Sequence, residues 1–284
     1  MDACLKPGSW EAASSWLRIG DEKMSRILSL CVGVAAVALL LAGGRAGAAP
    51  NKLPPAFKLC PRNDPNTVPC LEDAVDVAIR ELASGLKDFG IPSLEPLQIP
   101  QLGIGDPNSD APVNLKINFT DIRIYNLSNA KTSNAKLDYD TFLLSGHERV
   151  NSIYAEGNYV MDGRILLIPA KGEGKVSFTL TTLQVDLAMK GEKYAKKDKE
   201  FLKITEFPVN IYEPDKIVFN FENLFNGDKT LGSSINNLVN ENWKEIWPQL
   251  QDPLQQFLSY SFREYARRIF DKVSLDDVFL VKAP

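Results

Sequence analysis

Histidine and cysteine are scarce in this chain, and their scarcity restricts the chemistry that it can perform. The 284 residues include one histidine, His147, and four cysteines. One imidazole cannot build a multi-histidine metal site, and no nucleophile-elbow motif accompanies His147, which follows Gly146 at a predicted turn. We therefore predict no catalytic residue, no bound metal and no cofactor, and we do not expect an enzyme.

The chain also lacks a strong excess of charge. Its 32 basic and 36 acidic residues give a net charge of -4, and no basic block stands out. Such a surface repels phosphate backbones, so nucleic acid is not an expected partner. Hydrophobic residues make up 44% of the sequence, which is enough for a packed globular core.

No apolar run is long enough to span a membrane comfortably. The longest, residues 27–41, follows Lys23 and Arg26 and precedes the small triplet Ala46-Gly47-Ala48. This order is typical of a cleaved signal peptide, and a transmembrane anchor is the alternative. We predict a signal peptide at residues 24–48 and one secreted domain at residues 49–284.

The first 23 residues do not fit a signal peptide. Glu11, Asp21 and Glu22 place acidic charge where such a segment carries only basic charge, and Met24 is a better start. We interpret residues 1–23 as a non-native or untranslated extension.

Removing the signal peptide leaves Cys60 and Cys70 as the only cysteine pair. An even remainder in an exported chain predicts a disulfide, whereas two thiols and one histidine cannot complete a tetrahedral metal site. Two sequons, at Asn118 and Asn126, agree with export and are glycosylation candidates, although Asn118 falls in a predicted strand.

Apolar residues at steps of three and four predict an amphipathic helix over residues 71–89, ending at Gly90. A proline-rich segment from Pro92 to Pro107 follows, which we expect to be extended and to lie on the body of the protein. From about residue 113 to residue 221 the apolar period changes to two, which predicts antiparallel strands with one apolar face.

The alternation slips between Phe119 and Ile122 and again between Leu180 and Leu183, which predicts bulges that bend the sheet. Turn-forming residues predict hairpin tips at residues 171–174 and 196–199.

Two further helical stretches close the sequence. One follows Asn226-Gly227-Asp228 and is expected to kink or end at Pro248. The other begins at Asp252-Pro253 and continues to Phe270.

Several of these features together resemble the takeout and juvenile-hormone-binding family of insects, over nearly the whole mature chain. They are the Cys60 and Cys70 pair before a helix, Gly157-Asn158-Tyr159 to Gly163 with Ile165-Leu166-Leu167-Ile168-Pro169, Gly172-x-Gly174, Asn223-Leu224-Phe225-Asn226-Gly227-Asp228 with Leu231, Asn240-Glu241-Asn242-Trp243, and Asp277-Val278-Phe279.

The resemblance implies an α+β domain of the tubular lipid-binding type, in which a strongly curved antiparallel sheet wraps a long C-terminal helix and leaves a tunnel. It implies a secreted carrier, in haemolymph or chemosensory lymph, for a juvenile-hormone-like terpenoid, a fatty acid or a semiochemical. Roles in hormone transport, feeding or daily rhythm follow from the same resemblance. We expect a monomer without stable membrane insertion, and the sequence identifies no receptor.

Inward-facing apolar residues are the candidates for the tunnel wall, although plain core packing uses the same residue types. They are Phe119, Tyr139, Tyr159, Met161, Phe178, Leu180, Phe219, Phe221, Trp243 and Phe257. The phenols of Tyr139 and Tyr159 are the candidate hydrogen-bond partners of an oxygenated ligand.

A membrane-binding or bacterial-lipid-binding defence protein is the alternative function. The final helix carries Arg263, Arg267, Arg268 and Lys272, a basic patch able to contact anionic lipid. Basic residues near a helix C-terminus also interact favourably with the helix dipole, so the patch is equally compatible with a structural role.

Overall fold

The fold is organised around a long antiparallel hairpin formed by β5 (Leu143–Ile165) and β6 (Ile168–Lys196). The computed structural model describes residues 52–62, 64–105, 113–165 and 168–280, so the predicted signal peptide and the extension before it lie outside the described residues.

Shorter strands pair with the two outer sides of this hairpin. On one side β5 pairs with β3 and β4, and β2 adds to β3; on the other side β6 pairs in turn with β9, β8 and β7. Their bounds are β2 Leu97–Ile104, β3 Val113–Tyr125, β4 Lys131–Asp138, β7 Lys199–Glu206, β8 Val209–Ile211 and β9 Lys216–Phe221. The predicted antiparallel sheet is confirmed.

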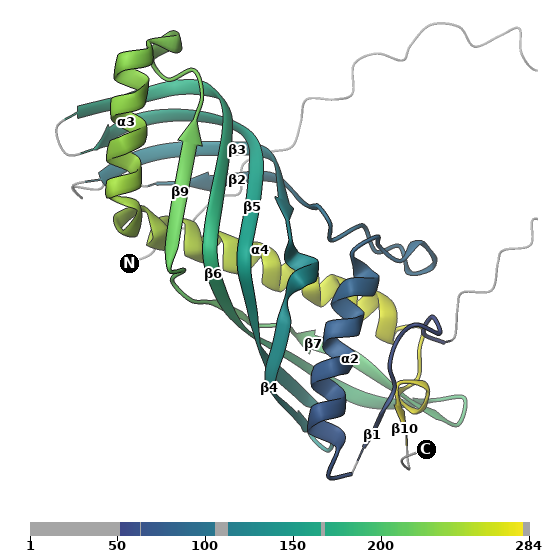
Figure 1. The fold of residues 1–284 in the computed structure, drawn as a ribbon. Helices are drawn as coiled ribbons and strands as arrows, with labels where there is room; N and C mark the ends of the chain where they lie inside the picture. The colour runs from purple at the N-terminus through teal and green to yellow at the C-terminus, as the bar shows by residue number, and fades with distance from the viewer. Residues whose placement is uncertain (1–51, 63, 106–112, 166–167, 281–284) are drawn as a thin grey trace, which may run out of the picture. The chain divides into compact units, whose positions relative to one another are not determined.

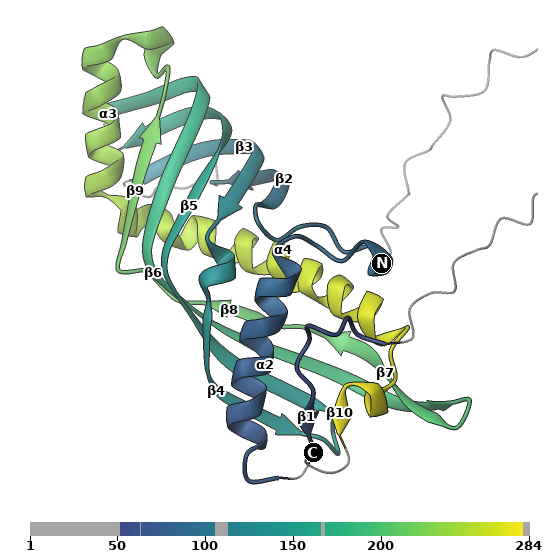
Figure 2. The same cartoon turned by 45° about the vertical axis from the view of Figure 1, so that its right-hand side comes forward.

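Helices cover the concave side and the ends of this sheet. The strands curve around α4 (Trp243–Phe270), α3 (Lys229–Glu241) lies beside β9, and α2 (Thr67–Leu82) lies beside β4 (Figures 1 and 2). Single helical turns are η1 Lys87–Phe89, η2 Leu127–Asn129, η3 Phe225–Gly227 and η4 Leu275–Asp277. The α+β class and the helix-wrapping sheet are as predicted.

The first predicted bulge is present in β3. The register between β3 and β5 shifts between Thr120 and Arg123, and Asp121 adopts a φ of 53°. The chain comes so close here that a Cβ on Gly157 would lie 2.9 Å from the Thr120 backbone carbonyl, which favours glycine.

The second predicted irregularity is present in β6, but it does not interrupt the pairing of the central hairpin. The register of β5 with β6 runs unbroken past Thr182, whose φ is 51°. The irregularity lies on the opposite side of β6, where its partner changes from β9 to β8. The apolar pattern detected the irregularity in β6 but could not show which neighbouring strand changes its pairing there.

One of the two predicted hairpin tips is correct. Lys197 and Asp198, both with positive φ, connect β6 to β7. The tip predicted at residues 171–174 is wrong, since Gly172 and Gly174 lie inside β6. A Cβ on Gly174 would lie 2.7 Å from the Glu222 carbonyl, so these glycines permit the close approach of the chain after β9. Gly146 and His147 likewise lie inside β5 and not at a turn.

The first helix is shorter than predicted. It ends at Leu82, and the chain then turns at Gly85 so that Leu86 pairs with Ile91. The apolar spacing continued to Phe89 because Phe89 and Ile91 join a small separate core cluster with Val273. Within the proline-rich segment, β2 forms the edge of the sheet. Pro100 has no backbone N–H, which is tolerated at an edge because no hydrogen bond between interior strands is lost.

The predicted end of the helix at Pro248 and the predicted start of another at Asp252 are wrong, because α4 is continuous through Pro248 and Pro253; a kink at Pro248 stays a prediction. The break falls at Asn242, between α3 and α4, where ψ is 23°. Pro248 is exposed, so water can reach the carbonyl that loses its donor. The predicted helix start after residue 226 is present, with the Asp228 carboxylate accepting from the backbone N–H of Thr230 and Leu231.

The predicted disulfide joins Cys60 to Cys70. It links β1 (Cys60–Pro61) to the first turn of α2, and β1 pairs in parallel with β10 (Phe279–Leu280). The two ends of the described domain are thereby held together.

Side-chain amides of α3 take the place of a further strand beside β9. Asn240 Oδ1 accepts from the Phe219 N–H at 2.7 Å, and its Nδ2 donates to the Phe219 carbonyl at 2.9 Å. Asn236 bonds Phe221 in the same way, at 2.8 and 2.9 Å. Because the two asparagines lie one helical turn apart, they match alternate residues of the strand.

Helix α4 holds β8 by the same kind of contact. Gln255 Oε1 accepts from the Ile211 N–H at 2.7 Å, Gln251 Nε2 donates to the Ile211 carbonyl, and Ser259 Oγ accepts from the Val209 N–H at 3.1 Å. These bonds satisfy backbone groups of an edge strand and fix the helix along it.

Truncating these amides is predicted to destabilise the fold. Asn236→Ala or Asn240→Ala leaves a backbone donor and a backbone acceptor of β9 unpaired, so each should lower the free energy of unfolding by about 1–3 kcal/mol. Urea unfolding measures the loss, and Asn237→Ala, at an exposed position of the same helix, is the control. Equal effects at all three positions would contradict the role of the two partly buried amides.

A candidate ligand-binding cavity

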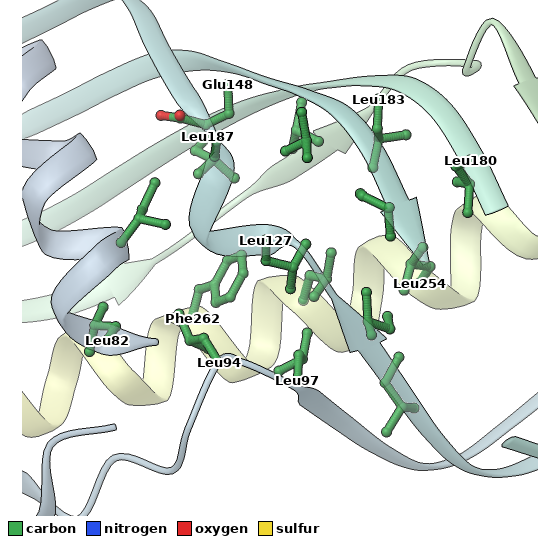
Figure 3. Close-up of a pocket in the computed structure, with 18 of the residues that line it drawn as sticks. Leu82, Leu94, Leu97, Leu127, Glu148, Leu180, Leu183, Leu187, Leu254 and Phe262 are labelled. Atoms are coloured by element: carbon green, nitrogen blue, oxygen red, sulfur yellow. The ribbon is translucent and has the colours of Figure 1, made fainter. Parts of the chain in front are cut away.

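An elongated cavity of about 340 Å³ lies between the concave face of the sheet and α4. Its wall follows α4 from Trp247 to Phe270, which is about 35 Å at a rise of ~1.5 Å per residue. The lining residues therefore extend along most of α4. Figure 3 shows part of its wall, in which leucines from the sheet, α2 and α4 surround the space.

The helical side of the cavity is one apolar stripe of α4. Its residues recur at steps of three and four, so they share one face of the helix. Its members are Trp247, Leu250, Leu254, Leu258, Phe262, Tyr265, Ala266, Ile269 and Phe270.

The sheet side is built from inward-facing residues of several strands. They are Leu97, Ile99 and Leu102 from β2, Phe119, Ile122 and Ile124 from β3, Glu148, Val150 and Ile153 from β5, Phe178, Leu180, Leu183, Val185, Leu187 and Met189 from β6, and Ile217 and Phe219 from β9. Leu94, Leu127, Ala130 and Phe207 complete it from the connecting segments.

Helix α2 covers one flank of the cavity with Val75, Ala78, Ile79 and Leu82. Its polar face is attached to β4, where Asp76 accepts from the Thr132 N–H and from Lys131 Nζ, both at 2.9 Å. Partial burial raises the pKa of Asp76, but these hydrogen bonds outweigh it, and the net pKa lies below its ordinary value. The carboxylate is therefore charged at neutral pH and holds the helix on the strand.

Glu148 is the acidic residue in an otherwise apolar wall. It is only 4% exposed, and its Oε2 accepts from Thr132 Oγ1 at 2.9 Å. Burial raises its pKa from 4.5 to about 6; the Thr132 hydrogen bond lowers it, the Asp76 charge raises it further, and His147 opposes that rise. In Figure 3 its carboxylate lies across the view from Leu180 and Leu254.

The titration of Glu148 predicts a pH-dependent stability. Because its pKa in the folded state exceeds the ordinary value, the folded protein binds this proton more tightly, so the stabilisation is complete below pH 4.5 and is lost as the pH rises to about 6. Relative to Glu148→Gln, the wild type should lose about 2 kcal/mol of unfolding free energy across this window.

Urea unfolding on both sides of the window measures this difference. Glu173→Gln, at an exposed position of β6, is the matched control and should show no such change relative to the wild type. A constant difference between wild type and Glu148→Gln at every pH would contradict the raised pKa.

Four of the ten residues predicted to contact a ligand lie in the cavity wall. They are Phe119, Phe178, Leu180 and Phe219. The rings of Phe119 and Phe178 are 6.4 Å apart and those of Phe178 and Phe219 are 5.8 Å apart, so the three form one aromatic group. Ligand contact by these residues stays a prediction.

Five of the remaining six lie in or against the same core but outside the cavity wall. Tyr159 donates its hydroxyl to the Glu222 carbonyl at 2.7 Å, and its ring contacts Phe221 edge-on at 4.8 Å. Burial, together with the Glu222 charge, raises the pKa of Tyr159 to about 12. Its phenol is thus occupied within the protein. Met161, Phe221 and Trp243 are buried in this core, and Phe257 packs against it.

Tyr139 belongs to a different core cluster, next to the disulfide. Its hydroxyl donates to Glu200 Oε2 at 2.7 Å, and the Arg62 and Lys193 cations lie 4.5 and 3.7 Å from its ring centre. Burial and the Glu200 hydrogen bond raise its pKa. Tyr139 does not line this cavity, and its phenol and ring are occupied by contacts with Glu200, Arg62 and Lys193.

Sequence reasoning missed the α2 face, Glu148 and most of the α4 stripe. The stripe was interrupted in the prediction because Pro248 was expected to break the helix; a continuous 3.6-residue period through both prolines would have found it. Glu148 and Val150 are two residues apart in a strand, so strict alternation would have placed the carboxylate inward.

The family model for haemolymph juvenile hormone binding protein matches residues 31–280. The chain belongs to this family. Its takeout branch is also represented by a solved structure, Takeout 1 of Epiphyas postvittana, with a TM-score of 0.69 and 20% identity over 79% of this chain and 100% of that one. This likeness shows the fold.

Curated relatives include the circadian clock-controlled protein daywake of two fruit flies. The Drosophila melanogaster protein is 20% identical over 239 residues, 80% of this chain and 88% of its own length. The Drosophila yakuba protein is 20% identical over 220 residues, covering 74% and 83%. Members of the family are carriers of lipids or hormones, and the family is one of binding proteins.

Two further findings concern the described part of the chain. No helix there combines the length and the apolar character that crossing a membrane requires. Among the same residues, no three or more of His, Cys, Asp and Glu gather in a group that could hold a metal ion.

Proposed function

We propose that this protein is a secreted carrier that holds one elongated apolar molecule in the cavity between the sheet and α4. The observation that carries the proposal is an elongated cavity with an apolar lining along α4, in whose wall the described residues include no lysine, arginine or histidine. Ligand pockets that bind by burial have this character, with few polar groups to orient the guest. The ligand classes that fit are a juvenile-hormone-like terpenoid, a fatty acid derivative and a semiochemical.

Burial supplies enough free energy for this function. A chain of ~15 carbons gains about 12 kcal/mol at ~0.8 kcal/mol per methylene removed from water. The ligand's loss of translational and rotational freedom and the ordering of side chains offset several kcal/mol of this gain. The remaining free energy corresponds to dissociation constants between about micromolar and nanomolar. No charged contact is needed.

Secretion is supported by the disulfide, since such bonds persist in oxidising compartments. Of the two sequons, Asn126 is exposed at the start of η2, whereas the Asn118 amide accepts from Gln101 Nε2 at 2.9 Å across the pair of β2 and β3. We propose Asn126 as the better glycosylation site. Haemolymph or chemosensory lymph, a monomeric state and a role in daily rhythm are further proposals that rest on the family.

Three of the four cations of the basic patch behind the alternative function are engaged in contacts within the domain. Arg267 pairs with Glu264 and Asp271, each at 2.9 Å, and Arg268 donates to the Gly90 carbonyl. Lys272 donates to the Asp88 carbonyl at 2.8 Å. Since these cations already bind their own domain, the carrier is better supported than a membrane-binding protein.

The direct test is native mass spectrometry of the protein purified from insect-cell medium, followed by organic extraction. We expect a bound apolar molecule that leaves when the protein unfolds. Protein that is empty and that binds no terpenoid or long-chain lipid added to it would overturn the proposal. Co-sedimentation with anionic vesicles in place of ligand binding would favour the alternative.

Filling the cavity is predicted to weaken binding. Leu254→Trp adds bulk to the α4 stripe, so displacement of a fluorescent naphthylamine probe should show an affinity at least about tenfold weaker, because over 1.4 kcal/mol of burial is lost. Tyr260→Trp, on the same helix but 63% exposed, is the control and should bind normally. Normal binding by Leu254→Trp would place the ligand elsewhere.

A further inference from the structure

Almost all of the surface that the wall presents to the cavity is carbon. Among the described lining residues, only Glu148, Trp247 and Tyr265 carry a nitrogen or oxygen in the side chain. Ligand cavities usually orient their guest with a few such groups directed inward. The positions of these three groups therefore decide which ligand chemistry the cavity accepts.

The polar atoms of all three side chains lie away from the cavity. The Glu148 carboxylate is buried and accepts from Thr132 Oγ1 of β4 at 2.9 Å. The indole Nε1 of Trp247 is enclosed by protein atoms. Burial raises the pKa of Tyr265, and the guanidinium of Arg268, which is outside the cavity wall, opposes that rise. These residues contribute carbon to the wall and offer a guest no hydrogen bond.

The two phenols that the sequence suggested as ligand partners are engaged elsewhere. Tyr159 donates to the Glu222 carbonyl and Tyr139 to Glu200 Oε2, each at 2.7 Å, and neither tyrosine lines the cavity. An ester, ketone or hydroxyl enclosed by the described wall would therefore lose its hydration without gaining a hydrogen bond. A carboxylate would lose still more, whereas a hydrocarbon has no polar group to desolvate.

The apolar surface continues along most of α4. Lining residues of this helix run from Trp247 to Phe270, and the sheet faces them mainly with leucine, isoleucine and phenylalanine. Each methylene of an extended chain gains free energy on burial in the same way, wherever it lies along this wall. An oxygen inserted into the chain would reduce that gain.

We propose that the guest of this cavity is a long-chain hydrocarbon, an alkane or alkene that carries no oxygen. This inference rests on the proposed function and narrows its ligand class. It favours hydrocarbons over fatty acids and over terpenoids that carry an ester or an epoxide. Recognition then depends on chain length and shape, because the wall has no group that could read a functional group.

The test uses liquid alkane as the reference for an interior without hydrogen-bond donors. The secreted protein is equilibrated with pentadecane that contains a trace of its mid-chain ketone, and separately with pentadecane that contains a trace of methyl tetradecanoate. The protein is then separated and extracted, and gas chromatography gives the proportion of each compound bound.

We expect the protein to hold the ketone and the ester in no greater proportion than the liquid does, because a wall of carbon offers them nothing that pentadecane lacks. Enrichment of either compound by about threefold or more, the smallest factor that one hydrogen bond supplies, would overturn the inference. Enrichment of the ester alone would show that the cavity takes lipids with a polar head. This measurement needs no variant.

A matched pair of variants on β5 checks that the guest contacts the wall. Val150→Thr places a hydroxyl on the wall with little change in side-chain shape, so it should enrich the ketone about three- to tenfold relative to the wild type. Val160→Thr, at a 54% exposed position of the same strand, should match the wild type. An unchanged ketone proportion in folded Val150→Thr would also overturn the inference, since the guest would then lie elsewhere.

The outcomes separate this inference from the function on which it rests. If neither pentadecane nor the oxygenated compounds are recovered with the protein, the proposed carrier function fails as well. If the ketone or the ester is enriched in the wild type, the protein is still a carrier, and only the restriction to hydrocarbons fails.

Discussion

Hydrogen bonds from helix side chains to the backbone of β8 and β9 determine how α3 and α4 lie on the sheet. Asn236 and Asn240 bond Phe221 and Phe219, and Gln251 and Gln255 bond Ile211. An edge strand normally needs another strand, a covering segment or water for these groups. Here the helices provide the partners, so their distance from the strand is set by the length of an amide side chain.

This arrangement explains how a well-folded interior can contain an elongated void. Close packing usually removes such spaces, because each unfilled volume forfeits dispersion contacts. When polar contacts along one edge fix the position of a helix, its apolar face cannot move further into the curve of the sheet. The remaining space is available to a molecule from outside, whose burial recovers the lost contacts.

The sequence contained most of the fold in readable form. Apolar residues at every second position, such as Ile153, Ala155 and Tyr159, identified strands correctly. One face of this sheet is buried and the other is exposed to solvent. Features that depend on distant neighbours were misread. Gly172 and Gly174 have the composition of a turn, but they are small because the segment after β9 packs across them.

The candidate site was less predictable for the same reason. Tyr139 and Phe178 look alike in a strand pattern, yet one joins the chain ends and the other lines the cavity. Whether an aromatic residue packs in the core or lines the cavity depends on where the concave face of the sheet separates from α4. That separation is a property of the assembled sheet. Trp247 was seen as an apolar residue of a helix, and only the structure reveals that its nitrogen is unpaired.

The unbroken pairing of β5 with β6 has a consequence for how this fold can diverge. Because β7, β8 and β9 each pair separately with one stretch of β6, insertions in the loops between them alter local pairing alone. Deleting a single residue within β6 would instead exchange the inner and outer faces of every position beyond it. Length variation among homologous chains should therefore gather in the outer loops, while the central hairpin keeps a constant register.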